Sequence, residues 1–174
     1  IPVYPITPQT PILEKLTDFH AAGELDAEII TPESEHSAMA ACIAASLTGV
    51  RVFTATASQG LMLMHELLHY ASGAQAPIVM CNVNRTVGSP WGFWPAQTDS
   101  LAQRDTGWIQ FYTESGQESL DTVIQAFRIA EQLLIPVMIN HDAFYVSHAL
   151  EPVDVPAQSL VDRYLPPYAP EHFL

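Results

Sequence analysis

The sequence predicts a three-layer αβα domain built on a mainly parallel sheet. Short runs that favour β-strands alternate with stretches of helical pattern along the chain, which is typical of βαβ units. The chain has 174 residues, of which 48% are hydrophobic, so it can bury a substantial core. We place the domain at residues 1–150 and expect residues 151–174, with their proline-rich end, to form an extended tail or linker toward an absent domain. Because the first residue is Ile rather than Met, we expect a fragment of a longer protein.

The first elements are expected to be a helix, a strand and a second helix. Residues 10–20 are predicted as a helix because Pro11 suits its first turn. Residues 27–30, Ala-Glu-Ile-Ile, are predicted as a strand. The alanine-rich residues 35–47 are predicted as a small-residue helix that ends before Gly49.

The alternation continues to about residue 140. Residues 84–104 are rich in Gly, Pro and Trp and lack a regular period, which is typical of a loop that carries function. Residues 77–83 are continuously apolar, which favours a strand covered on both faces. The remaining predictions are strands at 50–56, 108–113 and 136–140, a helix at 58–72 and an amphipathic helix at 117–134.

Ligands of open α/β sheets bind beyond the carboxyl ends of the strands. Three segments of this sequence follow predicted strand ends: residues 31–35, residues 56–60 and the loop that opens at Asn84-Arg85. We therefore expect these three segments to line the functional site.

Composition excludes some partners. The chain has 6 Lys and Arg residues against 19 Asp and Glu residues, and its formal charge of −13 offers no basic patch for nucleic acid. Its apolar runs stay well short of the roughly 18 residues of a membrane span, and no signal-peptide pattern opens the sequence, so we expect a cytoplasmic protein without a membrane partner. Cys42 and Cys81 are predicted as buried reduced thiols, with a disulfide between them as the alternative, and they are too few to ligate an iron–sulfur cluster.

A zinc hydrolase is one alternative. Residues 65–69, His-Glu-Leu-Leu-His, match a zinc-binding motif in which two imidazoles lie one helical turn apart. No Asp or Glu occurs between Glu66 and Asp99 to act as a third ligand. Helical surface or packing roles therefore explain these histidines better.

A serine hydrolase is the other hydrolytic alternative. Ser58, Asp142 and His148 follow the chain order of an α/β-hydrolase triad. In that fold the turn that carries the nucleophilic serine has a glycine two residues before it, and Thr56 occupies this position here. A turn that starts a helix is the simpler interpretation of Ser58.

Glu35 and Thr7 are candidates on local grounds. Glu35 begins an apolar helix, whose N-terminus favours a carboxylate, and an ordinary first-turn acid fits the same pattern. Thr7 lies between Pro5 and Pro8, which hold it in an extended, rigid segment. An ordinary turn also fits Thr7.

Five blocks of sequence carry a more specific signal. In order, they are Tyr4-Pro-Ile-Thr-Pro-Gln-Thr-Pro-Ile12, Glu33-Ser-Glu-His-Ser-Ala-Met39, Phe53-Thr-Ala-Thr-Ala-Ser-Gln-Gly-Leu61, Asn82-Val-Asn-Arg85 and Gln97-Thr-Asp-Ser-Leu-Ala-Gln-Arg-Asp-Thr-Gly-Trp108. Together they resemble the alpha chain of pyruvate:ferredoxin oxidoreductase, of the 2-oxoacid:ferredoxin oxidoreductase family. The resemblance extends over nearly the whole chain.

This resemblance implies an enzyme that decarboxylates a 2-oxoacid oxidatively, with coenzyme A as acyl acceptor and ferredoxin as electron acceptor. In the family, thiamine diphosphate lies between a pyrimidine-binding domain, which this chain resembles, and a domain that holds the diphosphate and Mg²⁺ through a Gly-Asp-Gly-type motif. That motif is absent here. The resemblance thus implies a cofactor shared with a partner, and Mg²⁺ and [4Fe-4S] clusters on other chains.

The resemblance also implies roles for particular residues. Glu35 matches the glutamate that hydrogen-bonds the pyrimidine N1′ and takes part in catalysis. Thr7 and Arg85 match residues that bind the substrate, and no metal ligand is expected on this chain. Gln97 and Asp99 are weaker candidates for the mouth of the site.

The native substrate stays open among related 2-oxoacids. Pyruvate is the first expectation, and branched-chain 2-oxoacids are the alternative. Residues 88–95 depart from the resemblance and leave the fit of the substrate's side chain undecided. A non-catalytic assembly subunit is a further alternative, against which the presence of Glu35 and Arg85 argues.

Overall fold

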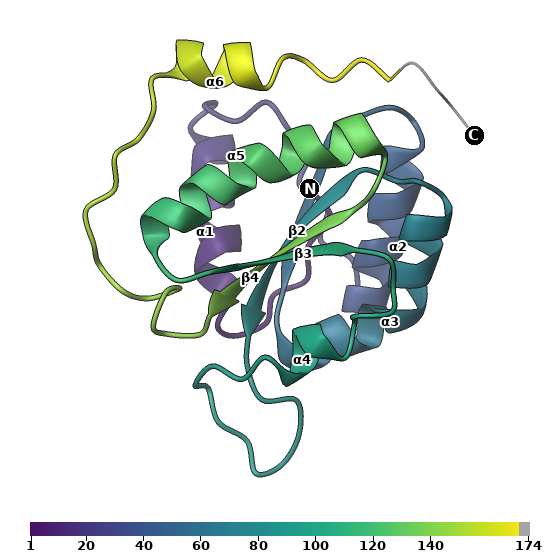
Figure 1. Cartoon of the computed structure of the whole chain (residues 1–174), viewed down its shortest axis with the longest axis vertical. Coiled ribbons are helices and arrows are strands. Elements are labelled where there is room, and N and C mark those ends of the chain that lie inside the picture. The colour runs from purple at the N-terminus through teal and green to yellow at the C-terminus, as the bar shows by residue number, and fades with distance from the viewer. Residues whose placement is uncertain (171–174) are drawn as a thin grey trace.

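A four-stranded parallel sheet forms the centre of the computed structural model, which describes residues 1–170 (Figure 1). The strands lie in the order β1-β2-β4-β3, and every neighbouring pair is parallel. The strands are β1 (Val52–Thr56), β2 (Ile78–Asn84), β3 (Ile109–Thr113) and β4 (Val137–Asp142), and the helices are α1 (Thr10–Ala21), α2 (Glu35–Ser46), α3 (Ser58–Gly73), α4 (Thr98–Leu101), α5 (Gly116–Leu133) and α6 (Gln158–Tyr164).

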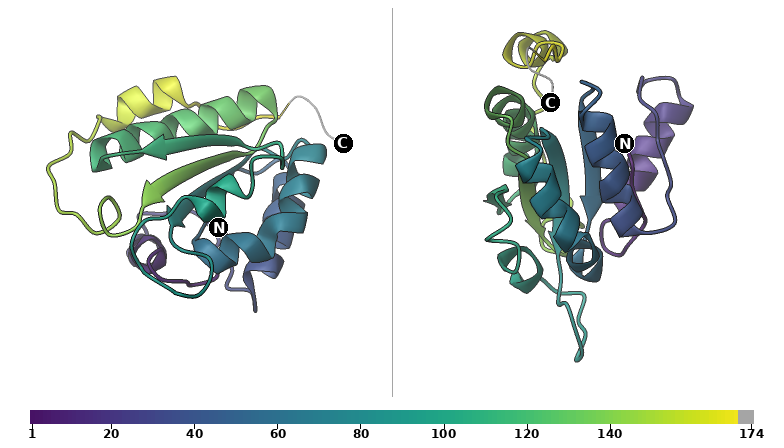
Figure 2. Two further views of the ribbon diagram at one scale, coloured as in Figure 1. Left: turned by 60° about the horizontal axis from the view of Figure 1, so that its bottom comes forward. Right: turned by 90° about the vertical axis from the view of Figure 1, so that its right-hand side faces the viewer.

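Helices cover both faces of this sheet (Figure 2). On one face, α2 and α3 bury side chains such as Met39 and Leu68 against Met80 and Met138 of the sheet. On the other face, alanines of α5 pack against the alternate strand residues, which include Val79. All seven residues of β2 are buried, as expected for a strand covered on both faces. The predicted three-layer αβα fold is therefore confirmed.

The strand predicted at residues 27–30 is wrong. The only β-pairing there is an isolated bridge between Pro2 and Ile30, in which Val3 N donates to the Ile30 carbonyl at 3.0 Å. The Ile30 side chain is largely exposed. This run of β-favouring residues extends beside the short N-terminal segment, not beside a strand of the sheet, so it cannot continue the ladder.

The predicted cysteine state is confirmed. Cys42 and Cys81 are both free and buried, one on each face of the sheet. Burial raises the pKa of each thiol to about 12, which keeps both in the unreactive protonated form.

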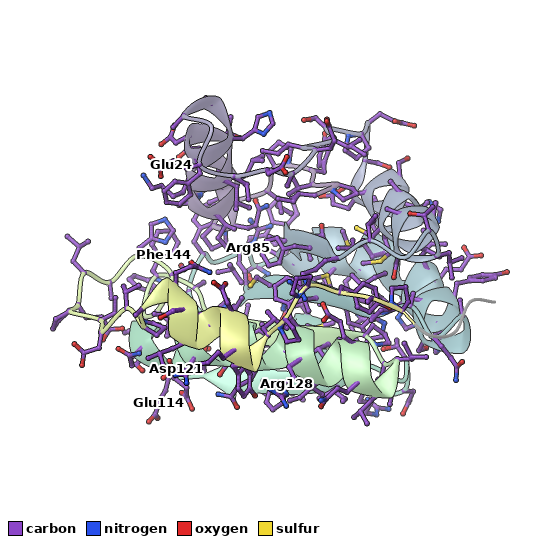
Figure 3. All side chains as sticks on the ribbon, turned by 90° about the horizontal axis from the view of Figure 1, so that it is seen from above. Glu24, Arg85, Glu114, Asp121, Arg128 and Phe144 are labelled. Carbon is purple, nitrogen blue, oxygen red and sulfur yellow. The ribbon has the colours of Figure 1, made fainter. Side chains whose placement is uncertain are left out.

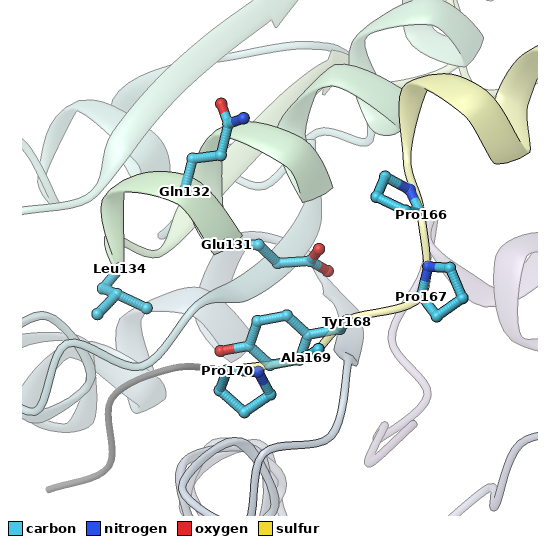
Figure 4. Close-up of a pocket in the computed structure, with 8 residues that line it drawn as sticks. All are labelled: Glu131, Gln132, Leu134, Pro166, Pro167, Tyr168, Ala169 and Pro170. Carbon is cyan, nitrogen blue, oxygen red and sulfur yellow. The ribbon is translucent and has the colours of Figure 1, made fainter.

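The segment after residue 150 returns over α5 (Figure 1). It holds the short helix α6, so residues 151–170 are not extended throughout. Arg51 pairs with Glu131 of α5 at 2.5 Å and also donates to the Pro166 carbonyl at 2.9 Å. A cavity of about 540 Å³ lies between the end of α5 and residues 166–170, where Tyr168 stands beside Glu131 (Figure 4).

The division of the chain at residue 150 stays a prediction, and residues 171–174 of the predicted tail lie outside the described residues. None of the helices described for residues 1–170 combines the length and the apolar character needed to cross a membrane.

Candidate functional site

The candidate site lies at the carboxyl ends of β1 and β2, where the sequence placed it. β1 ends at Thr56 and α3 begins two residues later, while β2 ends at Asn84, directly before Arg85. Because β1 and β2 are parallel neighbours, these two chain segments meet at one edge of the sheet. The first turn of α2 joins them there, since α2 packs against α3.

Glu35 is the first residue of α2. Ser34 precedes it as the N-cap and accepts a hydrogen bond from Ser37 N at 3.2 Å. The Glu35 side chain is only 9% exposed, yet within residues 1–170 its carboxyl group accepts no hydrogen bond from another residue. The positive end of the helix favours a negative charge at this position. Glu35 is therefore a buried carboxyl group that is free to bind a ligand.

Gly60, in the first turn of α3, gives Glu35 its space. A Cβ atom at Gly60 would lie 2.8 Å from Glu35 Oε1 and 2.5 Å from Thr56 Oγ1, both too short for real contacts. The absence of a side chain at this position thus lets a carboxyl group and a hydroxyl group approach the same turn.

Thr56 Oγ1 is buried and has no hydrogen-bond partner within the described part of the chain. Buried polar atoms are nearly always paired in folded proteins. Thr56 Oγ1 and the Glu35 carboxyl group are thus two polar groups without hydrogen-bond partners among residues 1–170, and the carboxyl group suits a ligand with a ring nitrogen, such as an aminopyrimidine. The residues present fit the pyrimidine portion of thiamine diphosphate.

Arg85 brings a cation to the same edge. Its Nη1 donates to the Thr7 carbonyl and its Nη2 to Gln59 Oε1, while the guanidinium carbon lies 5.6 Å from the centre of the Phe93 ring. Burial lowers the pKa of Arg85, and the nearby Asp99 carboxylate opposes that effect. Figure 3 shows Arg85 near the middle of the molecule, away from Arg128 on the α5 side.

Thr7 reaches this group through its backbone. The segment that carries it is fixed to the sheet by the buried side chain of Gln9, whose Nε2 donates to the Ala55 carbonyl at 3.2 Å. The Thr7 side chain itself is exposed at this edge. Thr7 and Arg85 are thus adjacent, and the Thr7 hydroxyl stays available for a ligand.

Asp99 lies beneath the site and not at its mouth. Its carboxylate accepts hydrogen bonds from Ser58 N at 3.0 Å, Asn84 Nδ2 at 2.7 Å and Arg85 N at 3.2 Å. Burial raises the pKa of Asp99, and these hydrogen bonds pull it back down. Asp99 therefore joins the starts of α3 and of the loop after β2 into one rigid unit.

Gln97 stands farther along the same edge. Its Nε2 donates to Asp142 Oδ1 at 2.5 Å, which ties the start of α4 to the end of β4. A positioning role thus describes Gln97 better than contact with a ligand.

Sequence reasoning missed Thr56, Gly60 and Gln59 as individual site residues. All three lie in the block at residues 53–61 that carries the family resemblance, and one sequence signal could have singled out Gly60. Gly60 occupies a helix start, where glycine needs a packing reason.

The structure offers no zinc site at the His65-to-His69 motif. His65 Nδ1 bonds to Gln103 Oε1 at 2.5 Å, and the His65 and His69 rings meet edge to face at 5.1 Å. Throughout residues 1–170, no group of three or more His, Cys, Asp or Glu side chains could hold a metal ion.

The serine-hydrolase triad is not assembled either. Ser58 Oγ donates to the Thr86 carbonyl at 2.6 Å, and His148 bonds to the neighbouring Ser147 at 2.8 Å and stacks on Phe144. Asp142 instead accepts the bond from the Gln97 amide. A base that is not bonded to Ser58 cannot activate its hydroxyl.

Comparison with known proteins gives matches along the whole chain. The family model described as "Pyruvate flavodoxin/ferredoxin oxidoreductase, thiamine diP-bdg" matches residues 1–174. The ketoisovalerate oxidoreductase subunit VorA of Pyrococcus horikoshii is 58% identical over 100% of this chain and 44% of its own length. The pyruvate synthase subunit PorA of Methanothermobacter thermautotrophicus is 55% identical over 100% of this chain and 46% of its own length.

A solved structure supports the fold. A 2-oxoglutarate:ferredoxin oxidoreductase from Magnetococcus marinus superimposes with a TM-score of 0.72 at 22% identity, over 83% of this chain and 26% of that chain. The present chain spans less than half the length of the VorA and PorA proteins. The match of the family model along all 174 residues shows that this chain belongs to the thiamine-diphosphate-binding family of pyruvate flavodoxin/ferredoxin oxidoreductases.

Proposed function

We propose that this chain is the pyrimidine-binding part of a 2-oxoacid:ferredoxin oxidoreductase. The reaction converts a 2-oxoacid and coenzyme A into acyl-CoA and CO₂ while ferredoxin takes up the electrons. The observation that carries the proposal is the buried Glu35 carboxyl group, which lies beside Gly60 and has no hydrogen-bond partner among residues 1–170. One relative is named for ketoisovalerate and another for pyruvate, which supports a 2-oxoacid as the substrate. Both acids belong to the proposed substrate class.

Glu35 is the catalytic residue in this proposal. Thiamine diphosphate, when bound, supplies the electron sink that decarboxylation of a 2-oxoacid requires. The Glu35 carboxyl group, which is sheltered from bulk water, would hold the pyrimidine ring and supply or take up a proton at its ring nitrogen N1′.

Arg85 and Thr7 bind the substrate in this proposal. Two N–H groups of Arg85 are occupied by Thr7 O and Gln59 Oε1, and the guanidinium carries further donors. These donors suit a carboxylate, which pairs with guanidinium in a fork. The Thr7 hydroxyl adds a neutral donor at the same place.

The remaining parts of the enzyme belong to partner chains or domains. A diphosphate-binding part would hold Mg²⁺ and the phosphates, and iron–sulfur subunits would hold [4Fe-4S] clusters and pass electrons to ferredoxin. The coverage of 44% of the VorA relative leaves room for such parts beyond this chain. A cytoplasmic location is part of the same proposal.

An assay of the complete enzyme tests this function. With thiamine diphosphate, coenzyme A and an electron acceptor present, we expect reduction of the acceptor that depends on both a 2-oxoacid and coenzyme A. Release of CO₂ should match formation of acyl-CoA. Failure of every 2-oxoacid, with a separately prepared family enzyme active under the same conditions, would reject the proposed function.

A further inference from the structure

We propose that Trp91 and Phe93 recognise the side chain of the substrate and select apolar side chains larger than the methyl group of pyruvate. Both residues lie in the loop between β2 and α4, which extends beyond the carboxyl ends of the strands (Figure 1). This inference rests on the proposed function and assigns specificity within the same site.

A cavity lies beneath these two rings. It has a volume of about 380 Å³ and is lined by Gln59, Arg85, Trp91, Gly92 and Phe93. Sites for small molecules typically measure about 300–1,000 Å³ and combine apolar walls with a few polar groups. The cavity thus has the size and the lining of a site for a small acid.

The same cavity adjoins the proposed cofactor site. Gln59 lines it and accepts a hydrogen bond from Arg85. The next residue, Gly60, is the one whose missing side chain makes space for Glu35. A substrate whose carboxylate is held by Arg85 would therefore lie in a cavity that borders the proposed cofactor site, with Trp91 and Phe93 forming its apolar wall.

The loop holds the two rings in place. Thr86 Oγ1 donates to the Gly92 carbonyl at 2.8 Å and accepts from Gly92 N at 2.9 Å, which fixes the residue between Trp91 and Phe93. Gln59 Nε2 also donates to the Val87 carbonyl at 2.5 Å. The two aromatic side chains are thus attached to an anchored backbone.

Charge and exposure indicate the class of side chain. Arg85 is the only charged residue among the five that line the cavity, so a ligand with one carboxylate is matched. A second carboxylate would lose its hydration against apolar rings without a partner, which costs free energy. Trp91 and Phe93 are 74% and 58% exposed, so an apolar ligand would remove considerable ring surface from water.

The test compares substrates that share the carboxylate and differ in the side chain. For the complete wild-type enzyme, we expect kcat/KM for 2-oxoisovalerate to exceed that for pyruvate by at least about 10-fold, the lower end of methylene discrimination in apolar pockets. Trp91→Ala and Phe93→Ala should each lower this ratio by about 10-fold. The ratio cancels any disturbance of Arg85, which both substrates use equally.

Trp94→Ala is the matched control. Trp94 is an exposed aromatic residue of the same loop, but its ring contacts Phe144 and Tyr145 instead of lining the cavity. This variant should retain the wild-type substrate ratio. Titration of the enzyme with 2-hydroxyisovalerate and lactate, which cannot be decarboxylated, should give the same order of preference in binding.

The outcomes separate this inference from the proposed function. If 2-oxoacids are converted but the ratio stays unchanged in both variants, or pyruvate is preferred by the wild type, the inference is overturned and the function stands. If the variants assemble poorly with the partner chains while the fraction that does assemble keeps the wild-type substrate ratio, the rings form a protein interface and the inference is overturned. If no 2-oxoacid is converted, the proposed function itself fails.

Discussion

Arg85 is a half-buried cation that makes no ion pair with a carboxylate of residues 1–170. Its two side-chain hydrogen bonds go to neutral oxygens, those of Thr7 and Gln59. A guanidinium group that is partly removed from water and has only neutral partners is suited to receive an anion. At the scale of single residues, this feature supports the proposed role of Arg85 in binding the carboxylate of the substrate.

Replacement of Arg85 should weaken substrate binding strongly. Arg85→Ala leaves the carboxylate without its charged partner. The fall in kcat/KM should correspond to a loss of about 2–5 kcal/mol of binding free energy and should appear mainly as a higher KM. Arg85→Lys should recover part of this loss, since a point charge cannot reproduce the fork. Steady-state kinetics of both variants, with Arg104→Ala as the exposed control, measure the effect. An unchanged KM in Arg85→Ala would assign the carboxylate to another residue.

The residues that sequence analysis identified and missed differ in a physical way. Glu35, Thr7 and Arg85 could be proposed from the sequence because each lies in one of the five blocks that carry the family resemblance. The approach of Gly60 to Glu35 spans 25 positions in the chain and depends on how α2 packs against α3. Local periodicity does not encode such a contact, so the space at Gly60 became apparent only in the structure.

At the scale of elements, His141 joins β4 to its neighbours. Its Nδ1 lies 2.9 Å from Thr113 Oγ1 of β3 and 3.0 Å from Ser119 Oγ of α5. The side chain is 6% exposed, and burial lowers the pKa of His141 to about 4. The folded protein therefore keeps this imidazole neutral well below the pH at which an exposed histidine becomes charged.

This burial should make folding stability dependent on pH. Between pH 6.5 and about 4, the unfolded chain binds a proton at His141 that the folded chain does not, so stability should fall as the pH falls. The contribution to the free energy of unfolding is at most about 3.5 kcal/mol, at about 1.4 kcal/mol per pKa unit. Urea unfolding of wild type and His141→Gln across this range should show a shallower slope for the variant. Parallel curves would contradict this role of His141.

The ion pair between Arg51 and Glu131 connects the start of β1 with α5, and Arg51 also reaches the segment after α6. The carboxylate is 11% exposed and the guanidinium 32%, and Arg51 also binds the Pro166 carbonyl. Arg51→Met keeps much of the apolar stem and removes both polar contacts. The free energy of unfolding should fall by about 1–3 kcal/mol, which lies between the values for exposed and for buried ion pairs.

Hydrogen exchange should locate this effect. In Arg51→Met, amides of α6 should exchange faster, while those of β2 and β4 should be less affected. Arg104→Met is the control, since the Arg104 side chain is 74% exposed and contacts only the adjacent Asp105 in its ion pair. Unchanged exchange in α6 would show that other contacts, such as Arg128 with Tyr164, suffice to hold it.

Most elements could be predicted because their signals are local. The buried run of β2, the capped α2 and the amphipathic α5 each carry a pattern that packing reinforces. Residues 27–30 have a strand's composition but lie beside the N-terminal segment, which the local pattern could not reveal. The helix α6 was missed because it is short and surrounded by proline-rich sequence.

At the scale of the whole molecule, the proposed function makes this chain one side of a shared site. The carboxyl edge of its sheet carries Glu35, Gly60 and Arg85, which fit a pyrimidine ring and a carboxylate. Throughout residues 1–170, no cluster of acidic or other ligating side chains could hold the metal ion of a diphosphate site. Under the proposed function, the diphosphate and its metal are held by a partner, and activity is expected only in the complete enzyme.

The most direct measurement of the central claim is hydrogen–deuterium exchange at C2 of thiamine diphosphate bound to the complete enzyme. Glu35→Gln keeps the shape of the side chain but cannot transfer the proton, so exchange should slow by about 100- to 10,000-fold while folding and assembly are retained. Glu33→Gln, an exposed neighbour, should exchange at the wild-type rate. Wild-type exchange in Glu35→Gln would contradict the assignment of Glu35 as the catalytic residue.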